Sequence, residues 1–195
     1  MESGIVIINK EKDWTSQDVV SKVKRILGTK KAGHIGTLDP LATGVLPVLI
    51  GNATKLSKYL MEHDKTYIAV LQLGQKKTTG DDEGEVIEEQ EIGVLDEENI
   101  KSVLVQMKGK QLQAPHKFSA VKINGKKLYE YSREGQEVEI PKREIEIYEI
   151  NLLNVDQEIK QIVFEVSCSK GTYIRVLCED IAQKLGTVRI YEKFK

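Results

Sequence analysis

The strongest constraint on the fold is a glycine- and proline-rich stretch at residues 33–48, GHIGTLDPLATGVLPV. Glycine adopts backbone angles that other residues avoid, and proline fixes φ and lacks an N–H donor. The stretch can therefore form neither a regular helix nor a regular strand before Gly44, whereas the apolar residues 45–50 predict a buried strand. The sequence predicts a stiff loop that presents Asp39. Because Asp-Pro is a common turn pair, local composition alone favours a structural turn over a reactive carboxylate.

Composition indicates the size class and the cellular location of the protein more clearly than its function. The 195 residues suit one domain, and 40% hydrophobic residues support a core. We expect a cytoplasmic protein, because no apolar run is long enough to span a membrane, no signal peptide precedes Ile5, and the two cysteines lack metal-type spacing. The net charge of -1 does not exclude a nucleic-acid partner, since basic residues gather in two places. These clusters are Lys22, Lys24, Arg25, Lys30 and Lys31, and Lys117, Lys122, Lys126, Lys127 and Arg133.

Hydrophobic periodicity predicts an α+β domain on a largely antiparallel sheet. Strands are expected at residues 5–8, 45–50, 66–73, 86–87, 144–155 and 161–168, and residues 74–84 are expected to form a loop. Helices are expected after caps at Thr15 or Ser16, Thr54, Asp96 and Thr172. The predicted inward residues are Val19, Val20, Val23, Ile26 and Leu27 in the first long helix, Ile100, Val103, Leu104 and Met107 in the second, and Ile174, Leu177, Ile181 and Leu185 in the last. Cys168 and Cys178 are expected to pack in the core.

Residues 111–136 differ from the rest of the chain, because they are poor in large aliphatic residues and rich in lysine, tyrosine and glycine. Asn124-Gly125 between two short β-prone runs, 120–123 and 126–128, predicts a hairpin with a type I′ turn. Basic residues interleaved with Tyr129 and Tyr131 are typical of an RNA-gripping insertion. A plain surface hairpin with solvated lysines fits the pattern equally well.

One positively charged residue, Arg175, is predicted at an electrostatically unfavourable position. Arg175 falls in the first turn of the last predicted helix, where the helix dipole disfavours a positive charge. Such violations of a local rule tend to occur at functional sites. A carboxylate partner would relieve this one; the alternative is that Arg175 simply points to solvent.

Across residues 5 to about 186 the chain resembles the TruB family of tRNA pseudouridine synthases. The stretch GHIGTLDPLATGVLPV looks like that family's active-site motif, and further matches follow it along the chain. They are Lys10, GNATK at 51–55, KTY at 65–67, SAVK at 119–122, GKKLY at 125–129 and CSKGTYIR at 168–175. The resemblance implies isomerisation of a T-arm uridine (position 55 in tRNA numbering) to pseudouridine, with tRNA as partner. It implies no cofactor, metal, membrane or obligate protein partner.

The same resemblance implies a role for individual residues. Asp39 would be the catalytic carboxylate, Arg175 its ion-pair partner, and Tyr67 a ring that stacks on the flipped base and could move a proton. His34 would stack into the RNA that the uridine vacates, and Tyr173 would line the pocket. The RNA-holding residues would be Lys10, Lys55, Phe118, Lys122, Lys126 and Lys127.

The chain departs from the family pattern in two places. Family members often show Pro-Pro-x-Tyr-Ser-Ala where this chain has Pro115-His116-Lys117-Phe118-Ser119-Ala120, which keeps the ring at Phe118 and loses a hydroxyl. The family usually continues past Gly186 with another strand and a small C-terminal RNA-binding domain, so a shortened C-terminus is expected here. An alternative is therefore a tRNA-binding or tRNA-folding protein with weak or no catalysis. A hydrolase that uses Asp39 and His34 is a third and weaker interpretation.

Overall fold

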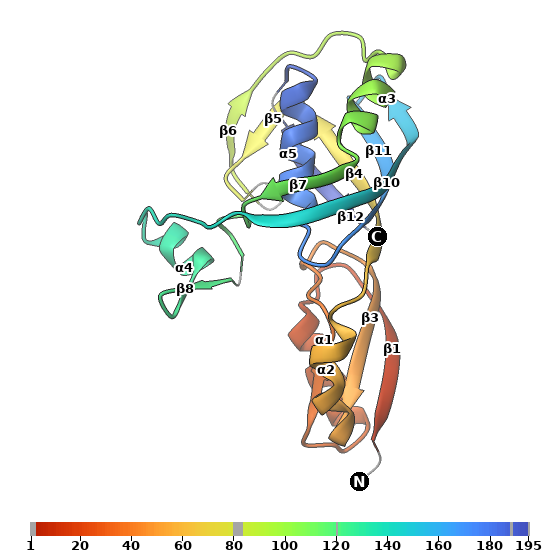
Figure 1. The fold of residues 1–195 in the computed structure, drawn as a ribbon, viewed down its shortest axis with the longest axis vertical. Helices are drawn as coiled ribbons and strands as arrows, with labels where there is room; N and C mark the ends of the chain where they lie inside the picture. The colour runs from red at the N-terminus through yellow and green to blue at the C-terminus, as the bar shows by residue number, and fades with distance from the viewer. Residues whose placement is uncertain (1–2, 80–83, 120, 188, 195) are drawn as a thin grey trace. The chain divides into compact units, whose positions relative to one another are not determined.

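The computed structural model describes residues 3–79, 84–119, 121–187 and 189–194, and the chain divides into two compact units. The first unit comprises residues 1–64 with 193–195, and the second comprises residues 65–192 (Figure 1). No helix of the described residues is long and apolar enough to cross a membrane. The α+β class predicted from the sequence is confirmed.

The first unit is a three-stranded antiparallel sheet with one long helix on its apolar face. The strands β1 (Gly4–Lys10), β3 (Gly44–Ile50) and β2 (Ala32–His34) lie in the order β1-β3-β2. The expectation of no regular strand before Gly44 was wrong at Gly33 and His34, because β2 pairs with the end of β3. Helix α1 (Ser16–Ile26) begins at a capping box, in which Thr15 and Asp18 each bond the other's backbone N–H. The core between α1 and the sheet contains Val19, Val20, Val23, Leu46, Val48 and Ile50.

The second unit is built on a five-stranded sheet in the order β12-β4-β11-β10-β7. Its strands are β4 (Lys65–Leu73), β7 (Gly109–Gln113), β10 (Arg143–Asp156), β11 (Gln161–Cys168) and β12 (Arg189–Phe194), of which residues 193 and 194 are assigned to the first unit. β4, β11, β10 and β7 pair antiparallel, in agreement with the predicted largely antiparallel sheet, although β7 itself was not predicted. One face is the core, because Ala69, Leu71, Ile162 and Phe164 are fully buried.

Helices α3 (Glu97–Gln106) and α5 (Ile174–Lys184) contact each other and pack on this sheet (Figure 1). Asp96 caps α3 through the N–H of Glu98, as predicted. The predicted inward residues of both helices are buried, except for the half-buried Leu185. Cys168 and Cys178 are both fully buried free thiols, which confirms their packing role.

The predicted hairpin with a type I′ turn is confirmed within residues 121–128. Strands β8 (Lys122–Ile123) and β9 (Lys126–Lys127) pair with Ile123 opposite Lys126, and Asn124 and Gly125 both have positive φ, at 52° and 83°. Ala120 lies outside the described residues. Leu128 lies outside the strand and begins the short helix α4 (Leu128–Arg133), which was not predicted.

Other local predictions were wrong at element ends. Ile26 and Leu27 are 67% and 53% exposed, because they lie at the C-terminal end of α1, past the buried residues Val19, Val20 and Val23. Thr54 caps no helix, since it lies inside the 3₁₀ helix η1 (Gly51–Leu56) and donates to Gly51 O, while α2 (Ser57–Leu60) follows without a side-chain cap.

Two further differences concern the second unit. Thr172 donates to Ser169 O instead of capping α5, whose N-cap is Tyr173. The predicted loop at 74–84 contains strand β5 (Gln75–Lys77), which pairs with β6 (Val86–Glu89); residues 80–83 lie outside the described residues. Strand β7 was not predicted, because its alternating residues are mostly polar.

Replacement of Gly125 tests the turn, because a β-branched side chain at positive φ costs about 1–2 kcal/mol. In Gly125→Val we expect faster hydrogen exchange, by about tenfold, at the amides of Leu128 and Tyr129, which bond Val121 O and Ser119 O. Gly93→Ala is the control, since Gly93 has ordinary φ and open space around it. Unchanged exchange in Gly125→Val would contradict the turn assignment.

Candidate active site

The Asp39 loop is held by backbone hydrogen bonds on both sides of the carboxylate. On one side, the buried Ser16 hydroxyl accepts from Leu38 N–H at 3.0 Å and lies 3.2 Å from Leu38 O. On the other side, Pro40 O accepts from Asp13 N–H at 2.9 Å and from Lys10 Nζ at 3.0 Å. The residues before and after Asp39 are thus fixed to the start of α1 and to the end of β1.

Lys10 occupies a place that does not fit the expected phosphate contact. Its side chain is only 1% exposed, and Nζ donates to three carbonyl oxygens, those of Glu11 (2.9 Å), Trp14 (2.6 Å) and Pro40 (3.0 Å). Burial lowers the pKa of Lys10, while the carboxylates of Asp13 and Asp39 act in the opposite direction. Lys10 therefore ties the loop together and places a positive charge near Asp39.

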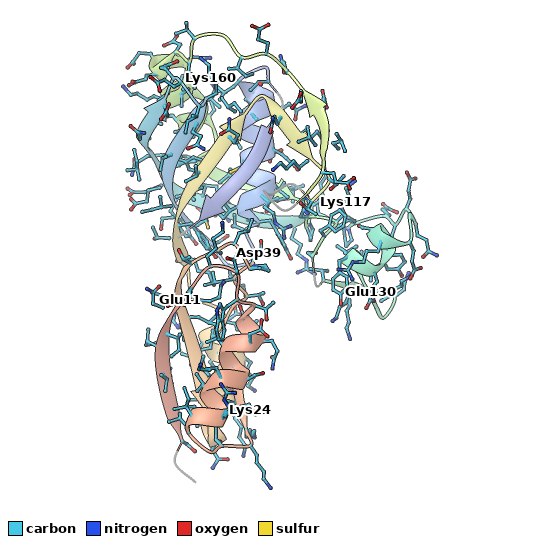
Figure 2. The ribbon with its side chains drawn as sticks, turned by 180° about the vertical axis from the view of Figure 1, so that it is seen from behind. Glu11, Lys24, Asp39, Lys117, Glu130 and Lys160 are labelled. Carbon is cyan, nitrogen blue, oxygen red and sulfur yellow. The ribbon has the colours of Figure 1, made fainter. Side chains whose placement is uncertain are left out.

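Two other predicted site residues of the first unit, His34 and Lys55, take no part in the contacts around Lys10. The Nδ1 of His34 lies against Gly36 O at hydrogen-bond distance, so the ring is anchored to the start of the same loop. Lys55 is exposed in η1, where its side chain is open to solvent. In Figure 2 the labelled Lys24 of the basic α1 cluster is well separated from Asp39 within this unit.

In the second unit, Tyr67 and Tyr173 are held by different elements. Tyr67 lies in β4 opposite Val166, half-buried, on the same face as the core residue Ala69. Tyr173 is the N-cap of α5, and the buried side chain of Gln113 bonds its backbone twice: Gln113 Oε1 accepts from Tyr173 N–H at 2.8 Å, and Nε2 donates to Tyr173 O at 3.2 Å. Gln113 therefore sets the start of α5.

Arg175 is buried, at 7% exposure, and it contacts the first part of the insertion. Nη2 donates to Phe118 O at 3.3 Å, Nη1 donates to Thr79 O at 3.3 Å, and Nη1 lies 3.5 Å from Nδ1 of His116. The structure thus brings together two of the predicted site residues, Arg175 and Phe118. The pairing of Arg175 with Asp39, one residue from each unit, stays a prediction.

The insertion presents cations against tyrosine rings. Lys126 lies 4.7 Å from the Tyr131 ring centroid, and Lys127 and Arg133 lie 5.2 and 5.3 Å from that of Tyr129. Lys126 also pairs with Glu134, and the hydroxyl of Tyr129 accepts from Lys127 and raises the pKa of that lysine. Figure 2 shows Lys117 where the insertion joins the unit and Glu130 in its outer part.

A cavity of about 710 Å³ lies beneath the insertion. Its lining includes the rings of Phe118 and Tyr131, the aliphatic side chain of Leu128, and Thr78 and Ile87 from the β5–β6 region. This volume lies within the range of small-molecule sites. Among the described residues, no group of three or more His, Cys, Asp or Glu side chains could hold a metal ion.

Three residues that position the site were not identified as functional from the sequence. Ser16, Gln113 and His116 act through buried side-chain contacts to residues 22, 60 and 59 positions away. The only feature that could have pointed to these three residues is that each is polar and yet buried in the structure. The sequence distance of each contact explains why no local pattern predicts it.

Comparison with known proteins gives one family. The model of the TruB family pseudouridylate synthase N-terminal domain matches residues 24–174. Proteins named tRNA pseudouridine synthase B are 48% identical in Psychrobacter cryohalolentis and in Bacillus pumilus, over 95% of this chain and over 53% and 62% of those proteins. The chain thus spans about half to three fifths of their length.

Two solved structures are similar in fold to this chain. The crystal structure of a Cbf5-Nop10-Gar1 complex matches with a TM-score of 0.75 and 29% identity, over 98% of this chain and 47% of that one. A structure of an H/ACA RNP bound to a substrate RNA containing 2′-deoxyuridine matches with a TM-score of 0.71 and 26% identity, over 98% and 45%.

Replacement of Lys10 tests whether it is a support for the loop. In Lys10→Met three carbonyls lose a charged donor, so we expect the free energy of unfolding, measured by urea titration, to fall by about 2–3 kcal/mol. RNA affinity, measured on the folded fraction, should change little. Lys12→Met is the control, because Lys12 is exposed. Unchanged stability with a large loss of RNA affinity would identify Lys10 as a phosphate contact instead.

Proposed function

Because the chain belongs to the TruB family of pseudouridylate synthases, we propose that it isomerises a tRNA uridine to pseudouridine with Asp39 as the catalytic carboxylate. In this reaction the N1–C1′ bond breaks, the uracil turns, and C5 bonds C1′ while the proton on C5 is lost and N1 gains one. The observation that carries the proposal is the two-sided backbone anchoring of Asp39 through Leu38 and Pro40. Rigid placement of a reacting group is a large source of rate enhancement.

We place the target uridine in the T-arm, at position 55 in tRNA numbering. The support is the resemblance of residues 33–48 to the family motif, together with relatives that carry the name tRNA pseudouridine synthase B. A uridine inside a folded loop is out of reach of a carboxylate until it leaves the stack. Base flipping is therefore part of the proposal.

The aromatic residues have proposed roles that follow their positions. Tyr67 and Tyr173 would contact the flipped uracil, and His34 would stack in the space that the base leaves. Phe118 would add a ring without a hydroxyl. Arg175 would interact with the ionised Asp39, since its guanidinium is oriented by the carbonyls of Thr79 and Phe118.

The charges of the hairpin support an anionic partner for the insertion. Lys122 stands directly opposite Lys127 in the β8–β9 pair, and like charges in such cross-strand positions are destabilising. An RNA phosphate between them would remove that cost, and the neighbouring tyrosines offer stacking surfaces. We propose that Lys122, Lys126 and Lys127 hold the T-arm, with exposed Lys55 as a further phosphate contact.

Asp39→Asn tests the catalytic carboxylate. We expect single-turnover pseudouridine formation in a T-arm stem-loop to fall by more than about 10³-fold, because the amide can act neither as nucleophile nor as base. The melting temperature and RNA affinity should stay close to those of the unchanged chain. Glu149→Gln, the same chemical change on an exposed position of β10, should leave the rate unaltered.

Full activity of Asp39→Asn would refute the assignment. If the unchanged chain binds the stem-loop in a salt-sensitive manner but forms no pseudouridine, then the alternative of an RNA-binding protein without turnover is correct. Efficient turnover eliminates that alternative.

The salt dependence of RNA binding tests the insertion. In Lys122→Gln we expect weaker binding and a plot of log Kd against log salt concentration whose slope is smaller by about 1, as for the loss of one phosphate contact. The control is Lys101→Gln on α3, because Lys101 pairs with Glu98 away from the insertion. Equal slopes for both variants would exclude Lys122 from the RNA contact.

A further inference from the structure

His116 is a buried polar residue at the base of the insertion. It follows β7 by three positions, and its side chain is 6% exposed. A buried imidazole is costly unless its nitrogens are satisfied, and both nitrogens of His116 face specific partners. The ring therefore has a defined orientation within the second unit.

The partners determine which nitrogen carries the proton. Phe118 N–H points at Nδ1 of His116 at 3.2 Å, so Nδ1 acts as the acceptor and is unprotonated. The hydrogen of the neutral ring is then on Nε2, which lies 3.8 Å from the Glu179 carboxylate on α5. That carboxylate attracts the Nε2–H dipole and favours this tautomer.

The same Nδ1 atom also faces Arg175. Nη1 of Arg175 lies 3.5 Å from Nδ1, and Nη2 donates to Phe118 O at 3.3 Å. The Nδ1 lone pair of His116 thus faces Nη1 of Arg175, and the carbonyl oxygen of Phe118 accepts from Nη2 of the same guanidinium. A proton on Nδ1 would replace the lone pair with a donor and would turn the guanidinium away.

We propose that His116 is a positioning residue: its Nδ1 lone pair fixes the Phe118 backbone and orients the Arg175 guanidinium for catalysis. The proposal rests on the proposed function of Arg175, and it adds a residue at which this chain departs from the usual Pro-Pro sequence. His116 itself contacts no reacting atom. It acts through Arg175 and through the backbone that carries the Phe118 ring.

The tautomer can be measured without any activity. In a long-range ¹H–¹⁵N spectrum at pH 8, above the ordinary pKa of histidine of about 6.5, we expect His116 to show the Nε2–H tautomer. His34 is the internal control, because its Nδ1 faces Gly36 O and must carry the hydrogen there. An Nδ1–H tautomer at His116 would overturn the proposal even if the chain proved inactive.

The catalytic role is tested by a pair of variants. His116→Leu introduces an apolar side chain of similar bulk that has no acceptor, whereas His116→Asn can place its amide oxygen near the Nδ1 position. In His116→Leu we expect the single-turnover rate to fall by about tenfold with RNA Kd changed by less than about threefold. His116→Asn should recover most of the rate.

Two results would contradict the positioning role. One is a normal rate in folded His116→Leu, and the other is an equal loss in His116→Leu and His116→Asn, which would mean that only the shape of the ring matters. Absence of pseudouridine with the unchanged chain would refute the proposed function instead, and the tautomer measurement would still decide the state of His116.

Discussion

The placement of Asp39 depends on a buried cation. Removing an ammonium group from water is costly, and Lys10 offsets that cost by donating to three backbone carbonyls, among them Trp14 O and Pro40 O. These bonds join the end of β1, the turn before α1 and the Asp39 loop. Ser16 completes the arrangement by bonding both backbone groups of Leu38. An irregular glycine- and proline-rich loop is thus held to the flanking sheet and helix on both sides of Asp39.

In the second unit, too, buried polar side chains hold the candidate site residues in place. The Gln113 side chain bonds the backbone of Tyr173 twice, and the 116–118 segment presents Nδ1 and a carbonyl to Arg175. In both units a buried polar side chain fixes the backbone next to a candidate site residue. Arg175 in the first turn of α5 is unfavourable for the helix dipole, and the carbonyls of Thr79 and Phe118 compensate for it locally.

The sequence predicted those features that depend on local chemistry. The alternation in β4 and β11, the Asp96 cap and the Asn124-Gly125 turn each follow from a few neighbouring residues, and the structure confirms them. Ile26 was predicted wrongly as buried, because helical periodicity alone does not show where packing ends at the last turn of α1. Lys10 resembles a surface lysine in sequence, and only the fold reveals the carbonyls around it. Gln113 and His116 were missed for the same reason, since their partners lie about 60 residues away.

The central claim is that a rigidly anchored Asp39 meets a flipped uridine. A crystal structure of the Asp39→Asn variant bound to a T-arm stem-loop tests it most directly, through the distance from the side chain at position 39 to the target nucleotide. We predict a uridine turned out of the stack, with C1′ or the uracil ring within about 3.5 Å of that side chain. A uridine that remains stacked in the RNA, or one that lies beyond the reach of position 39, would contradict the claim.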